Sequence, residues 1–217
     1  MGSPETRPGL VSAFEPGWQI LPGYRVWSMN GNPYALDSGD RQIVLTNRSF
    51  QQVDEILHKL PSEEIERRVA SGRVPISVLD IGGGYNSRAA IDMSWTYWRD
   101  VSVTNLDIIH GGKTQRLEKV TRVLGDVSDI PLPDACFDVA YATYVLAYLP
   151  GEKVEVAISE VSRVLRPGGV AFLLGEIYRE YAINQEALRV LFGKFGIEPT
   201  NYEISDDRLI AFQKPQP

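Results

Sequence analysis

Three acids and a glycine triplet are the residues of this sequence whose types and spacing suggest chemistry. Asp80 lies at the end of an apolar run and precedes Gly82-Gly83-Gly84, and Asp107 and Asp126 lie at or near the ends of two further short apolar runs. Glycines allow a positive φ and a close approach of the backbone to a bound molecule, and carboxylates accept hydrogen bonds. The pattern predicts a nucleotide-like ligand at the end of a strand.

Five short apolar runs predict the strands that position these residues. Each run is separated from the next by enough chain for a crossover, which predicts parallel strands with right-handed connections. Ligands in such sheets bind at the carboxyl ends of the strands, where the three acids would lie. The runs cover residues 78–81, 103–107, 122–127, 137–142 and 169–174.

The chain after these runs predicts a last helix and a hairpin. Residues 184–195 carry apolar side chains at helical spacing, and Gly196 is well placed to end that helix. Residues 202–204 and 209–212 predict two paired strands across the polar residues 205–207.

Residues 1–75 form an appendage in two parts. The first part is interrupted by glycine and proline, which favours an irregular or β-like cover. Residues 49–69 carry apolar residues at helical spacing that Pro61 interrupts, which predicts two helices beside the sheet. The aromatic side chains of the first part either line a substrate pocket or only pack the appendage onto the core, and both alternatives stay open. They are Trp18, Tyr24, Trp27 and Tyr34.

Residues 76–214 resemble the class I S-adenosylmethionine-dependent methyltransferases, and within them the small-molecule type. The most specific stretch runs from Gly125 to Val139 and is followed by Leu165-Arg166-Pro167-Gly168-Gly169. The resemblance implies an α/β fold with a doubly wound, mostly parallel seven-stranded sheet whose last strand is antiparallel. It also implies an N-terminal helical or irregular lid at residues 1–75 and an S-adenosylmethionine-binding core at residues 76–217.

The resemblance assigns roles to the first two acids. Asp80, with the backbone around Gly82 and Gly84, would hold the methionine portion of S-adenosylmethionine, whose ammonium group needs acceptors and whose carboxylate needs donors. Asp107 would accept hydrogen bonds from both ribose hydroxyls.

Further roles follow at the next two strand ends. Asp126 and the amide of Val127 would bind the amino group and a ring nitrogen of adenine. Ala142, Thr143 and Tyr144 would lie beneath the sulfonium, where carbonyl and aromatic groups suit a cation.

The chain departs from the family pattern at two places. Asn86 stands where a further glycine is usual, and asparagine tolerates left-handed backbone geometry better than most residues. The interval from Asp80 to Asp107 is longer than usual and that from Asp107 to Asp126 shorter, so the second crossover is expected to be a loop or a stub of helix.

A nicotinamide dinucleotide is the rival ligand, because such folds also pair a glycine turn with an acid. The three glycines are consecutive here, and Ser87 stands where the G-x-G-x-x-G pattern needs its last glycine. The sequence therefore favours S-adenosylmethionine.

Methyl transfer from a sulfonium is an in-line displacement with an already activated donor. The protein must mainly align the acceptor and exclude water, and a general base is needed only if the acceptor loses a proton. The candidate catalytic residues are His110 as a base and Tyr144 and Tyr148 as positioning groups. Asp129 and Asp134 lack a supporting histidine, so we expect no metal site.

Composition favours a soluble enzyme. The formal net charge of −6 provides no broad basic face for nucleic acid. The single cysteine, Cys136, excludes an intramolecular disulfide and fits a reducing compartment. Because the sequence shows neither a membrane span nor a signal peptide, we expect a cytoplasmic monomer or homodimer with a small-molecule substrate and no membrane or nucleic-acid partner.

Three functions follow from these observations. The leading one is methyl transfer from S-adenosylmethionine to an oxygen, nitrogen or carbon of a small-molecule acceptor. The second is an enzyme on the same fold that binds S-adenosylmethionine or S-adenosylhomocysteine without methylating anything. The third is a binding protein with a degenerate site, which the three intact acids count against.

Overall fold

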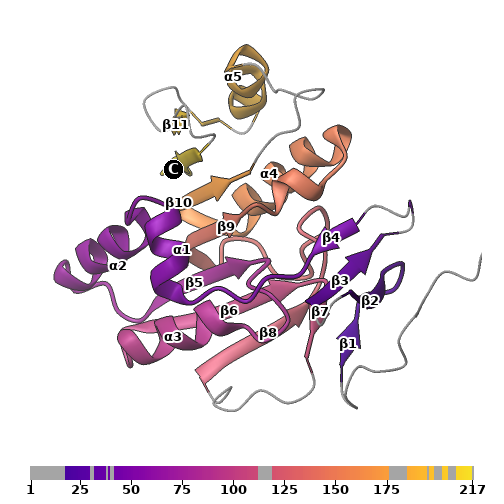
Figure 1. The fold of residues 1–217 in the computed structure, drawn as a ribbon. Coiled ribbons are helices and arrows are strands. Elements are labelled where there is room, and N and C mark those ends of the chain that lie inside the picture. Colours follow the sequence, from indigo (N-terminus) through magenta and orange to yellow (C-terminus); the bar gives the residue numbers. More distant parts are fainter. Residues whose placement is uncertain are drawn as a thin grey trace, which may run out of the picture.

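The computed structural model of the protein shows one large sheet with helices on both faces (Figure 1). Seven strands form the sheet in the order β11-β12-β10-β9-β5-β6-β8. β12 is antiparallel to both of its neighbours, and the other neighbouring pairs are parallel. The predicted sheet with an antiparallel last strand is confirmed. The residues described are 18–29, 32–37, 39, 42–111, 119–175, 185–194, 196–197, 202–204 and 209–216.

The strands of this sheet lie close to the predicted runs, and the largest differences are at two ends. The third predicted strand ends at Leu124 because the chain leaves the sheet at Gly125, whose amide donates to the carbonyl of Asp107 (3.0 Å). The fifth begins earlier, with a register shift between Leu165 and Val170. The strands are β5 (Ile76–Ile81), β6 (Val101–Asp107), β8 (Val120–Leu124), β9 (Phe137–Thr143), β10 (Leu165–Leu174), β11 (Tyr202–Ile204) and β12 (Leu209–Gln213).

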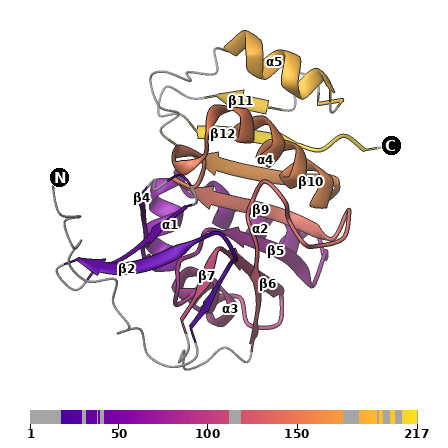
Figure 2. The same cartoon turned by 90° about the vertical axis from the view of Figure 1, so that its right-hand side faces the viewer.

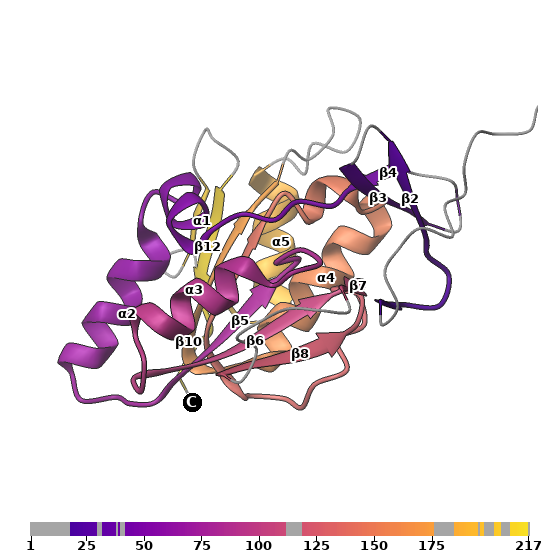
Figure 3. The ribbon, with the colours of Figure 1, turned by 60° about the horizontal axis from the view of Figure 1, so that its bottom comes forward.

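Five α-helices in the described part of the chain cover the two faces of the sheet (Figure 3). On one face lie α1 (Phe50–Ile56), α2 (Leu60–Ala70) and α3 (Arg88–Thr96), and on the other lie α4 (Gly151–Val164) and α5 (Gln185–Lys194). Each face has its own buried apolar cluster. None of the helices described is long and apolar enough to cross a membrane.

Local signals in the sequence account for several helix ends. Ser49 and Gln52 form a capping box that starts α1. Pro61 lies in the first turn of α2, where a missing amide hydrogen costs least. Gly196, with a φ of 67°, follows α5 as predicted.

The crossover after β8 departs from a regular βαβ pattern. Between β8 and β9 the chain forms a loop with an isolated bridge between Asp126 and Asp129 and no helix. Residues 112–118 of the second crossover lie outside the described part. Before them, β7 (Ile109–His110) turns away from the large sheet.

The first part of the appendage is β-like, as predicted. Strands β2 (Arg25–Met29), β3 (Asn32–Leu36) and β4 (Gln42–Val44) form a small antiparallel sheet (Figure 2). β1 (Gln19–Ile20) pairs with β7, which ties this part of the appendage to the chain that follows β6.

The second part of the appendage shares its core with the large sheet. Phe50, Leu57 and Ile65 belong to the same buried cluster as Val78 and Val139 of β5 and β9. Residue 75 therefore does not separate two independent cores.

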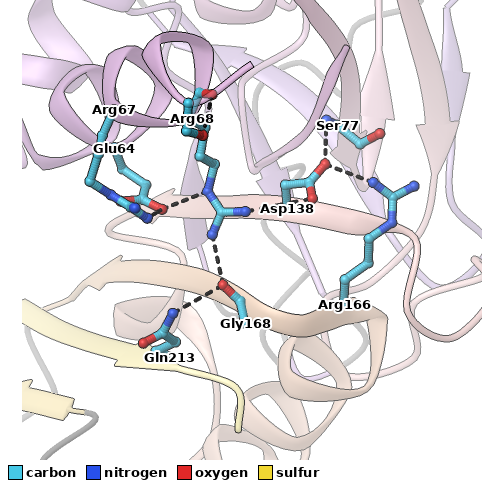
Figure 4. A network of polar contacts seen from close by, with 9 residues as sticks. Glu64, Arg67, Arg68, Ser77, Asp138, Arg166, Gly168 and Gln213 are labelled. Carbon is cyan, nitrogen blue, oxygen red and sulfur yellow. Dashed lines mark hydrogen bonds and ion pairs between the residues drawn. The ribbon is translucent and has the colours of Figure 1, made fainter. Parts of the chain in front are cut away.

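A buried arginine joins α2 to the sheet (Figure 4). The side chain of Arg68 is 2% exposed, and its Nε donates to Glu64 Oε1 (2.5 Å) while its Nη2 donates to the carbonyl of Gly168 in β10 (2.7 Å). Its Nη1 lies 3.6 Å from Asp138 Oδ1 in β9. Because few waters reach this guanidinium, these partners supply nearly all of its hydrogen bonds.

We predict that Arg68→Ala destabilises the fold far more than Arg67→Ala. Both arginines bind Glu64, but the side chain of Arg67 is 62% exposed. Removing one partner of a buried ion pair costs about 3–5 kcal/mol, whereas an exposed pair contributes about 1 kcal/mol or less. Urea unfolding of the two variants measures both costs, and equal losses would contradict the role given to Arg68.

Candidate functional site

A cavity of about 790 Å³ opens at the carboxyl edge of the large sheet. Its floor is formed by the turn after β5 and by the ends of β6, β8 and β9. The first turn of α4 forms one wall, and the appendage contributes residues 21–24, Asp37, residues 43–46 and Arg48. The three strand ends that the sequence singles out therefore meet at one cavity, and the appendage covers it.

The glycine turn is packed by protein on three sides. A Cβ on Gly82 would collide with Val145, and one on Gly84 would collide with the carbonyl of Thr46 in the appendage. A Cβ on Gly83 would collide with Asn105 and with the carboxyl of Asp80. Gly82 and Gly84 also have φ values of 69° and 82°, which L side chains adopt at a cost.

The left-handed residue after the triplet is Ser87 and not Asn86. Ser87 has a φ of 53°, is fully buried and donates through its hydroxyl to Asn105 Oδ1 (2.8 Å). A short polar side chain anchored to β6 thus stabilises the backbone geometry that was expected at Asn86.

Asp80 lies behind the glycine turn and does not line the cavity. Its side chain accepts a hydrogen bond from Asn105 Nδ2 (3.3 Å). Burial, and then the nearby Asp107, raise the pKa of Asp80 to about 7. In this position Asp80 supports the turn from below.

Asp107 lines the cavity and is oriented by the backbone. The amide of Gly84 donates to its Oδ2 (2.8 Å), and the amide of Ile109 donates to its Oδ1 (3.1 Å). Burial raises its pKa to about 6, against the opposing effect of these amides and of Arg122. Its carboxyl is therefore held in one orientation beside the glycine turn.

Asp126 lines the cavity, and its carboxylate accepts three hydrogen bonds and faces one cation. The amide and hydroxyl of Ser128 donate to Oδ1, each at 2.8 Å. The hydroxyl of Tyr24 donates to Oδ2 at 2.8 Å, and Lys153 Nζ lies 3.6 Å from the same oxygen. Burial alone would raise the pKa of Asp126, but these partners together hold it below its ordinary value.

The floor near β9 begins one residue later than predicted. Ala142 is buried in the core, while Thr143, Tyr144 and Val145 line the cavity. Tyr144 has a φ of 64°, and the guanidinium carbon of Arg48 lies 5.1 Å from the centre of its ring. A cation thus already occupies one face of this aromatic ring.

The remaining predicted residues divide between the cavity and the core. Val127 lines the cavity, and so does Tyr148, which lies in a short 3₁₀ helix, Leu146–Tyr148. His110 is 1% exposed, is bonded through Nε2 to the carbonyl of Val123 (3.0 Å) and does not line the cavity. Burial lowers the pKa of His110 to about 4. This position gives no support to a base role for His110.

Sequence reasoning missed several residues that line the cavity. Tyr24 was noted only as aromatic, and Thr46 and Arg48 belong to a segment without periodicity. Lys153 lies in the first turn of helix α4, which follows the predicted floor residues after the short 3₁₀ helix. Within the described residues, no cluster of three His, Cys, Asp or Glu side chains could hold a metal ion.

Comparison with known proteins assigns a domain to this sheet. Residues 79–173 match a family model described as a methyltransferase domain. Sterol 24-C-methyltransferase ERG6B of Gibberella zeae is 30% identical over 128 residues, which are 53% of this chain and 32% of that protein. The tRNA N(3)-cytidine methyltransferase METTL2 of Danio rerio is 25% identical over 142 residues, which are 58% of this chain and 40% of that protein.

A solved structure shows the same fold at low sequence identity. The [4+2]-cyclase SpnF superposes with a TM-score of 0.54 and 17% identity, over 78% of this chain and 84% of that chain. The chain spans only about a third of the length of the curated relatives that it matches first. The solved structure shows the fold, the family model matches residues 79–173, and the names of the relatives point to different acceptors.

We predict that Gly84→Ala costs more stability than Gly72→Ala. Both glycines have a positive φ, 82° and 77°, but only the Cβ at residue 84 would meet another group, the Thr46 carbonyl. The backbone penalty of about 1–2 kcal/mol applies to both, and displacement of the appendage adds to it at Gly84 alone. Urea unfolding measures the loss of unfolding free energy in each variant. Equal losses would contradict the prediction, because the appendage would then move away from residue 84 without cost.

Proposed function

We propose that the protein binds S-adenosylmethionine and transfers its methyl group to a small molecule, because residues 79–173 match a methyltransferase-domain model and lie in a sheet of the expected topology. The observation that carries the proposal is Asp107, whose carboxyl lies in the cavity and is held by the amides of Gly84 and Ile109. A carboxyl fixed in this way suits a pair of vicinal hydroxyls such as those of ribose.

The other cavity residues suit the remaining parts of the cofactor. The amide of Val127 and the carboxylate of Asp126 lie where an adenine edge would follow the ribose. Arg48, which lies beside Thr46 and the glycine turn, is the cation best placed for the methionine carboxylate. When bound, S-adenosylmethionine supplies an activated methyl group, so these side chains need only bind and orient it.

The acceptor would occupy the cavity between β4, the floor after β9 and the start of α4. Residues 43–45, Ala147 and Leu149 make this part mainly apolar, and Tyr144 and Tyr148 add hydroxyl groups that can orient an acceptor. No histidine lines the cavity among the described residues. This favours an acceptor with an available lone pair, such as a carboxylate or a neutral amine, over one that needs a general base.

An enzyme that binds the cofactor without methylation is the second candidate. The observation that favours it is the same lack of a histidine beside the predicted methyl position. Activity with any methyl acceptor would exclude it. We also propose a cytoplasmic monomer or homodimer without a nucleic-acid partner, as composition suggests.

The proposed function is tested by titrating S-adenosylmethionine and S-adenosylhomocysteine into the protein in a calorimeter. We expect micromolar binding that Asp107→Ala weakens at least a hundredfold, because the variant removes the ribose acceptor. Asp129→Ala, an exposed acid in the neighbouring loop, should leave the affinity unchanged. A failure of both ligands to bind, or full affinity in Asp107→Ala, would refute the proposal.

We predict that Tyr24→Phe strengthens cofactor binding about fivefold. Ser128 donates twice to Oδ1 of Asp126 and the Tyr24 hydroxyl donates to Oδ2, so an adenine amino group would compete with Tyr24 for Oδ2, and one hydrogen bond contributes about 1 kcal/mol. Tyr34→Phe, in β3 and outside the cavity, is the matched control. Weaker binding by Tyr24→Phe would instead mean that the hydroxyl contacts the ligand.

A further inference from the structure

A second pocket lies at the opposite edge of the large sheet, where β5, β9 and β10 begin. Its volume is about 330 Å³. Three arginines, Arg68, Arg73 and Arg166, line it together with Asp138, and Val74, Pro75 and Pro167 supply apolar walls. The length of the sheet separates it from the cofactor cavity, so an inference about it does not depend on the proposed function.

The pocket carries more positive than negative charge, although the whole chain has a net charge of −6. Asp138 is the one acid among its lining residues, and its two oxygens are already bound. The amide of Ser77 and Nη1 of Arg166 donate to Oδ2, and Arg68 faces Oδ1 (Figure 4). Glu64 lies next to the pocket, but its single negative charge is shared between Arg67 and Arg68, so the net positive charge of the pocket remains.

Two of the arginines retain unused donors. Arg166 is 44% exposed, and among the residues that the structure describes only its Nη1 has a partner, Asp138. Within the described residues, the side chain of Arg73 has no partner. Each guanidinium offers five N–H groups in a planar fork, which fits phosphate and carboxylate oxygens.

Only one of these three arginines, Arg68, has contacts that the stability of the fold requires. Arg68 is buried and bound to Glu64 and Gly168, so it would be required without any ligand. Arg73 and Arg166 flank the opening, and neither joins two elements through buried contacts. Their convergence on a pocket with apolar walls therefore points to an anion.

We propose that this pocket binds the phosphate dianion of a small organic phosphate. A phosphoryl group presents several oxygens in different directions and can accept from Arg73 and Arg166 together. The volume exceeds that of a phosphate group, so the apolar walls would contact the organic part. Free inorganic phosphate offers the same charged group but lacks these apolar contacts.

The test is calorimetric titration of phenyl phosphate and of inorganic phosphate at constant ionic strength. We expect phenyl phosphate to bind saturably and at least tenfold more tightly than inorganic phosphate. Arg73→Gln and Arg166→Gln should each weaken it at least tenfold, whereas Arg99→Gln, an exposed arginine elsewhere, should not. The far-ultraviolet circular dichroism and urea unfolding of all three variants should show a cooperative transition like that of the unaltered protein, which shows that they are folded.

Each outcome decides a part of the proposal. Equal affinity for the two probes, with loss in both pocket variants, supports the anion site and assigns inorganic phosphate as its ligand. Absence of saturable binding by either probe overturns the proposal. Full affinity in the double variant Arg73→Gln/Arg166→Gln also overturns it, because the anion would then bind elsewhere.

Discussion

The close packing of the glycine turn after β5 is the constraint on which the rest of the site depends. Val145, Thr46 and the Asp80–Asn105 pair each fill the space that a Cβ would take at one of its three glycines. The turn is thus held between the sheet, the loop after β9 and the appendage. Only a backbone without side chains lets these three parts meet, and the cavity is the space that they leave between them.

The two buried acids beside this turn have different structural roles. Asp80 lies beneath the turn and accepts a hydrogen bond from Asn105. Asp107 lines the cavity and accepts a hydrogen bond from the amide of Gly84. Burial raises the pKa of both acids, because water that would stabilise their charge is excluded. Asp80 thus supports the glycine turn, and the amide of Gly84 in that turn orients the carboxyl of Asp107.

The sequence predicted the mostly parallel sheet with its antiparallel last strand, because apolar runs are local signals. The acids that it placed at strand ends, Asp107 and Asp126, line the cavity. It could not place His110, which follows β6 but turns into the protein with β7. It also could not find Tyr24 or Arg48, because their positions depend on how the appendage folds back onto distant strand ends. The sequence also could not show that Asp80 lies behind the glycine turn and outside the cavity, because tertiary packing decides this position.

The shared core of α1, α2 and the large sheet limits how this protein can diversify. Because Phe50, Leu57 and Ile65 pack with strand residues of β5 and β9, the appendage is not an exchangeable module. Replacing it whole would expose the face of the sheet that it covers. Changes in the shape of the cavity would therefore arise by point changes in residues 21–24, residues 43–46 and Arg48, while the helices of the appendage stay fixed by the core.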